Sequence, residues 1–448
     1  MMNFKEILRI PSKYLRGISL PIIAAMLALM VIGITAISVA EQAARPNSIV
    51  RGSTIKQCIY AVVGIVAFIA AVVVPYRRIG QSSYILFGIN LSLLILVLFL
   101  PPIRNSHRWI DLRIFKVQPS ELIKVTYVVA LAWYLRYRDN YRRASGLIAP
   151  FVLTLIPAVL ILIEPDLGTT LLLFPTLFFM LFMAGAKLRH LVTVIILAAA
   201  VALMPIPIDT TGKDDTLTKD RKALAYWSGK IGKKEYTLLA GSLSIMKPHQ
   251  LARIEGWIKQ SDRCIAMSKG FQLQVSMFIL GSGGLTGEKM TRQKNIYFRM
   301  LPDDHTDFIY TIIGGQWGFL GCLAVLFIYL VIFFFGAEIA GTTDDPFGRL
   351  LVLGMLGLLF SQVFINLGMT MGLMPITGMT LPLISYGGSS MVVNCIAMGL
   401  MINVAHRRPR LLGRKPFEHG KNAQEEVASI GPLFQWAQSR NYNHNNKK

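Results

Sequence analysis

Apolar runs of roughly twenty residues recur along this 448-residue chain, and short polar segments separate them. A tilted membrane-spanning helix needs about 20 mainly apolar residues. By this measure the sequence predicts about ten spans, at 18–40, 57–75, 83–101, 119–136, 147–163, 167–186, 190–208, 307–336, 347–372 and 386–405. The pattern therefore predicts an all-α, polytopic membrane protein with one large extramembrane loop.

The fifth and sixth spans meet at Glu164-Pro165-Asp166. Two carboxylates and a proline are costly inside one continuous apolar helix, so we expect a turn at the membrane surface here. The first apolar run is long enough to remain as an anchor, and no cleavable signal peptide is expected.

Composition agrees with a membrane protein, because 53% of the residues are hydrophobic and only 16% are charged. The net charge of +22 is dispersed among the spans, which argues against nucleic-acid binding and favours contact with anionic membrane lipids. The four cysteines give neither a disulfide framework nor a metal-ligand spacing.

The short loops predict orientation, because basic residues concentrate on the cytoplasmic side. A cytoplasmic N-terminus places these basic residues inside: Lys5, Arg9, Lys13, Arg16, Arg77, Arg78, Arg136, Arg138, Arg142, Arg143, Lys187, Arg189, Arg407, Arg408 and Arg410. Both termini are then cytoplasmic. We expect a membrane domain over 1–408, with its outer loop at about 209–306, and a cytoplasmic, disordered tail over 409–448.

The predicted outer loop from Pro101 to Gln118 is an exception to this rule. Four basic residues stand there against the single acid Asp111, namely Arg104, Arg108, Arg113 and Lys116. One interpretation is ordinary tolerance of a statistical rule. The other is an outward-facing basic pocket for a phosphate-bearing lipid headgroup. We favour the pocket because other motifs converge on the same face.

The loop from Asp209 to Thr306 has two parts. Its charged first part, with a basic stretch over 212–247, predicts a solvated and partly helical segment. The second part contains Gly281-Ser282-Gly283-Gly284-Leu285-Thr286-Gly287, whose glycines suit either a re-entrant turn or a cradle for a headgroup.

Asp307 stands where this loop meets the next apolar run. Charge at the edge of hydrocarbon is expensive and is usually retained for ion pathways, proton relays or substrate handling. Asp307 is therefore the first candidate for a functional site.

Several motifs follow one another in an order that resembles the SEDS family of RodA and FtsW. They are Arg108-Trp109-Ile110, Gln118-Pro119-Ser120-Glu121-Leu122-Ile123-Lys124, Glu164-Pro165-Asp166-Leu167-Gly168-Thr169, Gly281-Ser282-Gly283-Gly284-Leu285, Leu301-Pro302 with His305-Thr306-Asp307-Phe308-Ile309, and Pro382-Leu383-Ile384-Ser385-Tyr386-Gly387-Gly388-Ser389-Ser390. The resemblance implies a peptidoglycan glycosyltransferase that polymerises lipid II on the outer face of the bacterial inner membrane, paired with a class B penicillin-binding protein. The run 369–378 is more similar to the RodA, or elongation, branch than to the division branch.

Asp307 matches the family's essential aspartate, which implies a general base that takes a proton from the acceptor sugar hydroxyl. The alternative is a helix N-cap, since Asp is a favoured capping residue. We interpret Asp303, Asp304 and His305 as hydrogen-bonding neighbours of the base or as a weak contact for a divalent cation such as Mg²⁺. The sequence assigns no other metal site and no cofactor.

Glu121 and Lys124 lie three residues apart and share one helix face, so a structural ion pair and a catalytic role are both open. Trp109 belongs either to the interfacial aromatic belt or to a sugar-stacking site beside Arg108. Asp166 either contacts substrate or caps the sixth span.

The resemblance further suggests contacts to the diphosphate or sugar from Arg253 and Gln272 in the outer loop, and from Ser385 before the last span. Small residues at 387 and 388 favour close helix packing instead. The chain departs from the family pattern at Gly287-Glu288-Lys289-Met290, at Pro302-Asp303, at Gly315-Gln316 and in the basic stretch. These departures concern the loop and leave the base in place.

Two rival functions remain open. A flippase that moves a lipid-linked precursor across the membrane would also use ten spans and helices broken by Gly and Pro. A non-catalytic scaffold would leave the charged motif residues without a chemical purpose. The clustering of charge at the predicted outer ends of the spans favours the transferase.

Overall fold

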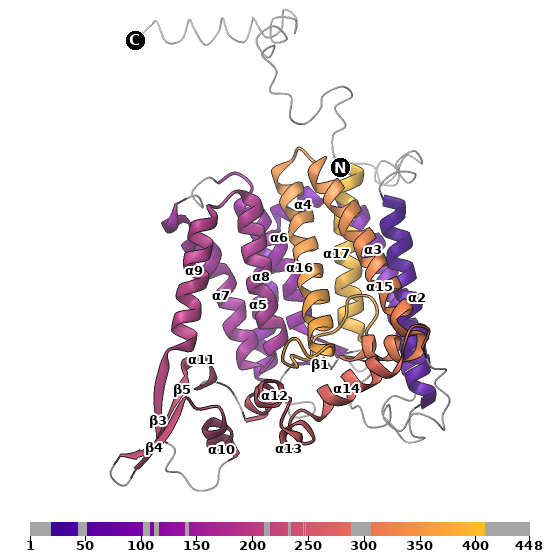
Figure 1. Ribbon diagram of the computed structural model, residues 1–448. Coiled ribbons are helices and arrows are strands. Elements are labelled where there is room, and N and C mark those ends of the chain that lie inside the picture. Colours follow the sequence, from indigo (N-terminus) through magenta and orange to yellow (C-terminus); the bar gives the residue numbers. More distant parts are fainter. Residues whose placement is uncertain are drawn as a thin grey trace, which may run out of the picture. The chain divides into compact units, whose positions relative to one another are not determined.

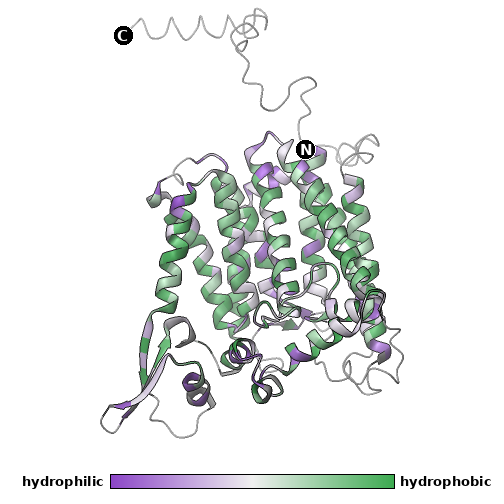
Figure 2. Cartoon of the chain, viewed as in Figure 1, coloured by the Kyte–Doolittle hydropathy of each residue, from purple (hydrophilic) through white to green (hydrophobic). Residues whose placement is uncertain are grey.

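A computed structural model of the chain describes residues 19–43, 52–101, 108–111, 116–138, 143–209, 216–231, 234–244, 246, 248–287 and 306–407. Long helices run side by side as a bundle, and smaller elements gather at one end of it (Figure 1). Figure 2 shows hydrophobic residues along the helices and hydrophilic residues at their ends. The predicted all-α membrane architecture is confirmed.

Each predicted span coincides with a helix. These helices are α2 (Ser19–Ala43), α3 (Ser53–Val73), α5 (Ser83–Leu98), α6 (Pro119–Leu135), α7 (Ile148–Ile163), α8 (Leu167–Ala184), α9 (Leu188–Leu203), α15 (Ile309–Gly341), α16 (Pro346–Thr370) and α17 (Gly388–Arg407). Within the described residues seven segments are long and apolar enough to cross a membrane, namely those of α2, α3, α7 together with the 3₁₀ turn before it, α8, α15, α16 and α17. The helices α5 and α9 have 16 residues each, and α6 has 17.

The centre of the bundle is α16, which packs against α6, α8, α15 and α17, while α17 lies along α3 and α15 along α2. Most side chains of α16 and α17 are buried. Their polar residues therefore need partners inside the protein, because hydrocarbon supplies none.

One end of the bundle is closed by a polar cluster around the C-terminus of α3 and the short helix α4 (Tyr76–Gln81). The Tyr76 hydroxyl donates to Asp345 over 2.7 Å, and Arg407 donates to the carbonyls of Val72 and Val73 over 2.8 and 2.6 Å. Arg77, whose Nε lies 3.5 Å from Asp345, belongs to the same cluster as Arg407. We call this end the Arg407 side and the opposite end, where α15 begins, the Asp307 side.

The Asp307 side carries the extramembrane elements. They are the hairpin β1 (Ile110–Asp111) and β2 (Lys116–Val117), the strands β3 (Pro205–Asp209), β4 (Trp227–Ile231) and β5 (Lys234–Ala240), and the helices α10 (Thr216–Ala223), α11 (Gly241–Ser244), α12 (Pro248–Ile258), α13 (Arg263–Ala266) and α14 (Phe271–Ser282). A 3₁₀ turn, Ala144–Leu147, precedes α7.

The prediction was wrong at the junction between the seventh span and the outer loop. The helix was expected to reach residue 208, but α9 ends at Leu203 and a strand begins at Pro205. Prolines at 205 and 207 lack the N–H that a helix interior requires. The following segment was expected to be partly helical, yet it forms α10 together with an antiparallel sheet in the order β3-β5-β4.

Candidate functional site

Asp166 joins the starts of two helices on the Asp307 side. The side chains of Gln118 and Ser120, where α6 begins, both donate to Oδ2 of Asp166 over 3.2 Å. Asp166 also accepts from the backbone N–H and the hydroxyl of Thr169, over 3.3 and 2.9 Å. It is the N-cap of α8. The capping alternative for Asp166 is confirmed, and the same carboxylate fastens α6 to α8.

Arg108 fixes the turn between α7 and α8. Its Nε donates to the carbonyl of Glu164 over 2.9 Å, and its Nη2 donates to the carbonyl of Pro165. Nε and Nη2 form the edge of the guanidinium that could otherwise bind a phosphate bidentately. The two carbonyls occupy that edge. The contacts support a role for Arg108 in positioning the turn.

Glu164 is completely buried in this turn. Burial, reinforced by the charge of Asp166, raises the pKa of Glu164 to about 8, and the nearby Arg108 opposes part of that rise. In the described part of the chain neither carboxyl oxygen has a hydrogen-bond partner. The sequence predicted the turn but not the raised pKa of this side chain.

Glu121 and Lys124 form the predicted ion pair in the first turns of α6. Lys124 Nζ lies 2.7 Å from Oε2 of Glu121, and both side chains are almost completely buried. Each charge is costly without the other in such an environment. The pair therefore places two opposite charges inside the bundle, in the first turns of α6.

Asp307 lies immediately outside helix α15. The helix begins at Ile309, and Phe308 occupies its N-cap position. The alternative that Asp307 is the N-cap residue is therefore wrong. Its backbone carbonyl accepts a hydrogen bond from Asn366 Nδ2 over 3.0 Å, and the same nitrogen donates to the Met379 carbonyl over 2.6 Å. Asn366 thus ties Asp307 to α16 and to the segment that follows it.

The side chains of Asp307 and Arg253 approach the same glycine from different elements. A Cβ added at Gly378 would lie 3.4 Å from Oδ2 of Asp307 and 3.7 Å from Nη1 of Arg253. Gly378 has φ +73°, a conformation that favours glycine. Arg253 also reaches the carbonyl of Ile376 over 3.5 Å. A carboxylate and a guanidinium from different elements therefore both lie within 4 Å of one point beside Gly378.

Helix α12 holds Arg253 in place through its neighbours. Trp257 Nε1 donates to the Gly372 carbonyl over 3.1 Å, and Gln260 donates to the same carbonyl over 3.1 Å. Glu255 is buried and pairs with Lys259 and Lys269. The helix is thereby attached to the end of α16, which also carries Asn366.

The segment between α16 and α17 connects the Asp166 network to Asp307. A Cβ at Gly168 would lie 3.0 Å from the Thr377 carbonyl and 2.6 Å from Met379. Ser385 is buried, and its hydroxyl accepts from the Leu381 N–H over 2.8 Å. The buried Gln57 donates to the Ser385 carbonyl over 3.1 Å. Ser385 therefore stabilises this segment, a role different from the predicted substrate contact.

The glycine turn packs against α15 as a backbone-to-backbone contact. Gly284 and Gly287 have φ +55° and +82°, and Gly318 inside α15 has φ +65°. The N–H groups of Phe319 and Leu320 donate to the carbonyls of Gly284 and Leu285 over 2.8 and 3.1 Å. The turn is thus a brace for α15 where the helix is kinked at Gly318.

Two predicted residues lie on this side with their side chains half-buried. Trp109 precedes β1, and Gln272 lies in the first turn of α14, which packs against α15. Other candidates are outside the described residues, namely Arg104, Arg113, Asp303, Asp304 and His305. Among the residues that are described, no group of three or more His, Cys, Asp or Glu side chains could hold a metal ion.

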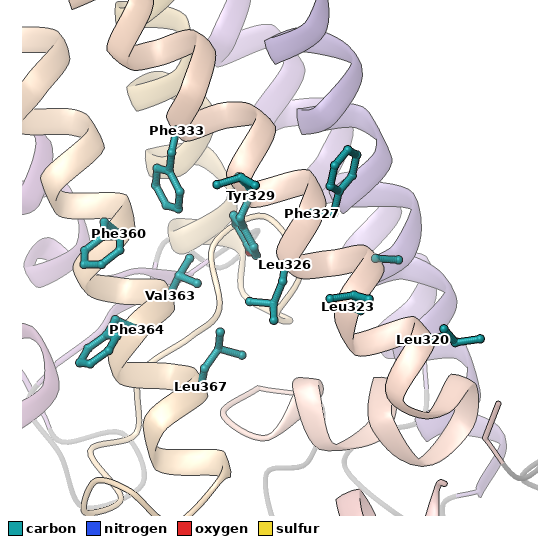
Figure 3. A pocket seen from close by; sticks show the side chains of 12 residues that line it. Leu320, Leu323, Leu326, Phe327, Tyr329, Phe333, Phe360, Val363, Phe364 and Leu367 are labelled. Atoms are coloured by element: carbon teal, nitrogen blue, oxygen red, sulfur yellow. The ribbon is translucent and has the colours of Figure 1, made fainter. Parts of the chain in front are cut away.

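An apolar groove of about 720 Å³ runs between α15 and α16. Figure 3 shows side chains of both helices lining it, including Phe327, Phe333, Phe360 and Leu367. Tyr329 lies in the same lining and donates its hydroxyl to the Pro382 carbonyl. The groove therefore borders both the segment after α16 and the helix that begins beside Asp307.

Comparison with known proteins identifies the family. Residues 18–410 match the model of the FtsW/RodA/SpoVE family, described as a cell cycle protein. The peptidoglycan glycosyltransferase RodA of Treponema pallidum is 32% identical over 79% of this chain and 90% of its own. A probable peptidoglycan glycosyltransferase FtsW of Geobacter metallireducens is 31% identical over 79% and 84%.

Solved structures show the same fold. One is a chain from a structure described as showing the structural coordination of polymerization and crosslinking by a peptidoglycan synthase complex. That chain is 25% identical to this one, with a TM-score of 0.66, and the match covers 86% of this chain and 96% of that chain. The rod shape determining protein RodA of Thermus thermophilus has 24% identity, a TM-score of 0.57, and coverage of 87% and 97%. With the family model spanning the whole bundle, the chain belongs to the FtsW/RodA/SpoVE family.

Proposed function

We propose that this protein is a peptidoglycan glycosyltransferase that polymerises lipid II into glycan strands, acting in elongation and shape maintenance of the bacterial cell wall. The single observation that carries the proposal is the approach of both Asp307 Oδ2 and Arg253 Nη1 to the same point beside Gly378. A base and a cation in one site are the two groups that transfer of a sugar from a diphosphate requires.

In the proposed reaction Asp307 accepts the proton of the acceptor sugar hydroxyl. That oxygen forms a bond to the anomeric carbon of the donor, and the bond from this carbon to the diphosphate breaks. The diphosphate departs with the bonding electron pair, and Arg253 stabilises its charge. A good leaving group needs no strong general acid, so one carboxylate is sufficient, in contrast to the hydrolysis of an ordinary glycoside.

Glu121 and Lys124 are proposed to complete the site from below. A buried lysine that is neutralised by a glutamate can orient a charged substrate without a large desolvation penalty. Asp166 and Arg108 hold the turn beside them. Trp109 and Gln272 are proposed to contact the sugars from the two loops that flank the site.

The apolar groove between α15 and α16 supports the proposal that the substrate is linked to a lipid. Its lining is hydrophobic apart from the Tyr329 hydroxyl, and its helices carry Asp307 and Asn366 at or near their ends on one side. A polyprenyl chain could lie there while its diphosphate reaches Arg253. The Asp307 side is accordingly proposed to face outward from the inner membrane, with both termini in the cytoplasm.

A class B penicillin-binding protein is the proposed partner. The solved complex with the similar fold is described as coordinating polymerization with crosslinking, and crosslinking is a second activity. The relatives include both RodA and FtsW at nearly equal identity, so action in division is the alternative cellular role.

The test is polymerisation of purified lipid II by detergent-solubilised protein, with and without the class B partner and with EDTA in a parallel reaction. Glycan strands should form in detergent, where there is no membrane to cross. A flippase would give no polymer there and would instead move a labelled lipid across sealed vesicles. Transport in vesicles without polymerisation in detergent would overturn the proposal.

A further inference from the structure

Helix α9 is too short to cross a bilayer by itself. Its 16 residues span about 24 Å at about 1.5 Å per residue, whereas the hydrocarbon core is about 30 Å thick. Leu191 is its buried residue, and most of its other side chains are exposed. In a membrane protein these exposed apolar side chains face lipid. The apolar residues after Leu203 can supply the missing length.

The apolar surface of α9 continues into the strand β3. Leu203 and Met204 are exposed, and so are Pro205, Ile206 and Pro207. The far end of the β4–β5 hairpin is hydrophilic, as Figure 2 shows. Hydrophobic character thus extends from the helix into the near part of the sheet and stops before its tip.

Two prolines close the free edge of β3. The sheet order β3-β5-β4 leaves β3 paired on one side, with Pro205 opposite Ala240 and Pro207 opposite Leu238. Successive N–H groups of an antiparallel strand point alternately toward the partner and away from it. Proline has no N–H, so Ile206 and Ile208 supply the N–H groups that face β5. The free edge therefore has no N–H at 205 or 207 to leave unpaired in an apolar layer.

The same prolines make a protein strand a poor occupant of this edge. Edge strands recruit other strands through their unpaired N–H and C=O groups, and proline prevents such pairing. The edge is instead continuous with the lipid-facing side of α9. A lipid surface is therefore the partner that these observations favour.

One face of the sheet carries the side chains that such a surface selects. Pro207, Leu238 and Trp227 lie opposite one another across the three strands and so point to the same side. Trp227 is 47% exposed, and the adjacent Tyr226 is 61% exposed. Trp and Tyr are enriched where membrane meets water. On the other face Leu239 and Thr237 are buried, and α10 packs against β5.

We propose that the sheet β3-β5-β4 is a membrane-surface anchor, with β3, Tyr226 and Trp227 in the interfacial layer on the Asp307 side. The exposed Lys230 and Lys234 then reach the headgroups from the hairpin tip. This inference goes beyond the proposed function and does not depend on it.

The anchor is connected to the candidate site. Helix α10 packs against both β5 and α12, and Lys259 donates to the Ala223 carbonyl at the end of α10 over 3.1 Å. Since α12 carries Arg253, docking of the sheet on lipid sets the height of that guanidinium above the membrane. The sheet β3-β5-β4 thereby fixes the position of the long segment between α9 and α15.

The experiment uses the full-length protein in nanodiscs whose lipids are brominated near the top of the acyl chain, because bromine quenches nearby tryptophan fluorescence. Wild type is compared with Trp227→Phe and with the control Trp257→Phe. Trp257 is half-buried and bonded to Gly372 inside the protein. The part of the tryptophan fluorescence that bromine quenches should decrease in Trp227→Phe. It should be unchanged in Trp257→Phe.

A second variant tests the edge itself. Pro205→Ala with Pro207→Ala restores two outward N–H groups, and quenching of Trp227 should fall while the Trp257 signal confirms the fold. Equal quenching in wild type and Trp227→Phe would overturn the proposal. Protection of Trp227 that develops only after the penicillin-binding partner is added would also overturn it, in favour of a protein-binding surface.

Discussion

Lys124 Nζ lies 2.7 Å from Oε2 of Glu121, one helical turn away, and the two side chains are almost completely buried. A buried ion pair is weak evidence for stability, since removal from water costs both charges their hydration. The presence of such a costly pair in the first turns of α6 instead supports a requirement for charge at this place.

Neutralising one partner should therefore harm the protein more than neutralising both. We expect Glu121→Gln or Lys124→Met alone to cost about 3–5 kcal/mol of stability, because each leaves an uncompensated buried charge. The double variant should cost less than the sum of the two. Thermal unfolding in detergent of all four proteins gives the double-mutant cycle, and additive losses would contradict the pairing.

Glu164 should make stability depend on pH. Its pKa is about 8 in the folded protein against an ordinary value of 4.5, so the folded state holds a proton that the unfolded state releases. Stability is then fully present below pH 4.5 and is lost progressively as the pH rises to about 8.

The variant Glu164→Gln keeps the shape and removes this titration. Its melting temperature should rise relative to wild type as the pH increases between those two values, and the two proteins should converge at low pH. Melting curves measured in detergent across this range provide the check. A difference that does not change with pH would show that Glu164 is ionised in the folded protein.

Gly318 should tolerate no side chain. Its φ is +65°, and an added Cβ would lie 2.3 Å from the Gly287 nitrogen. We expect Gly318→Ala to lose at least about 1–3 kcal/mol from backbone strain, with a further loss from displacement of the glycine turn. The control is Gly341→Ala in the same helix, where a Cβ meets nothing within 4 Å. Equal melting temperatures for the two variants would refute the bracing role.

The sequence predicted the helices well because hydrocarbon thickness dictates the length of an apolar run. It also predicted the turn at Glu164-Pro165-Asp166, since two carboxylates there exclude a continuous helix. It missed the strand at 205–209, because the two prolines argue against a helix there but so short an apolar run does not distinguish a strand from a loop. Short apolar runs of this kind need tertiary information.

The sequence also did not predict which residues distant in the chain form hydrogen bonds with one another. Gln57 and Asn366 stand out as buried polar residues within helices, but a single sequence does not say which carbonyls they bind. The carbonyl partners of Arg108 were equally hidden. The approach of Arg253 to Asp307 could be anticipated only from the family resemblance, because a 54-residue separation carries no geometric rule.

Asn366 should act as a positioning residue. Asn366→Leu has a similar volume but leaves the carbonyls of Asp307 and Met379 without their donor. Loss of such a buried hydrogen bond costs about 1–3 kcal/mol, which corresponds to a fall in kcat on the order of tenfold if Asp307 moves. We expect KM to change little.

The matched control is Ser361→Ala on the same helix, which removes only a bond to the Gly357 carbonyl within α16. Steady-state kinetics with lipid II compare the two variants. A fall in activity of equal size in both would indicate a general weakening of α16 and would exclude a specific effect on Asp307.

The central claim is that the Asp307 carboxylate accepts the proton of the acceptor hydroxyl. Asp307→Asn keeps the size of the side chain and removes the base, while Asp262→Asn makes the same change at an exposed residue between α12 and α13. The decisive measurement is the initial rate of lipid II polymerisation by each purified protein with the proposed class B penicillin-binding partner. We predict a loss on the order of 10²–10⁴-fold for Asp307→Asn, with normal folding and partner binding, and little change for Asp262→Asn. A near-normal rate for Asp307→Asn would contradict the claim.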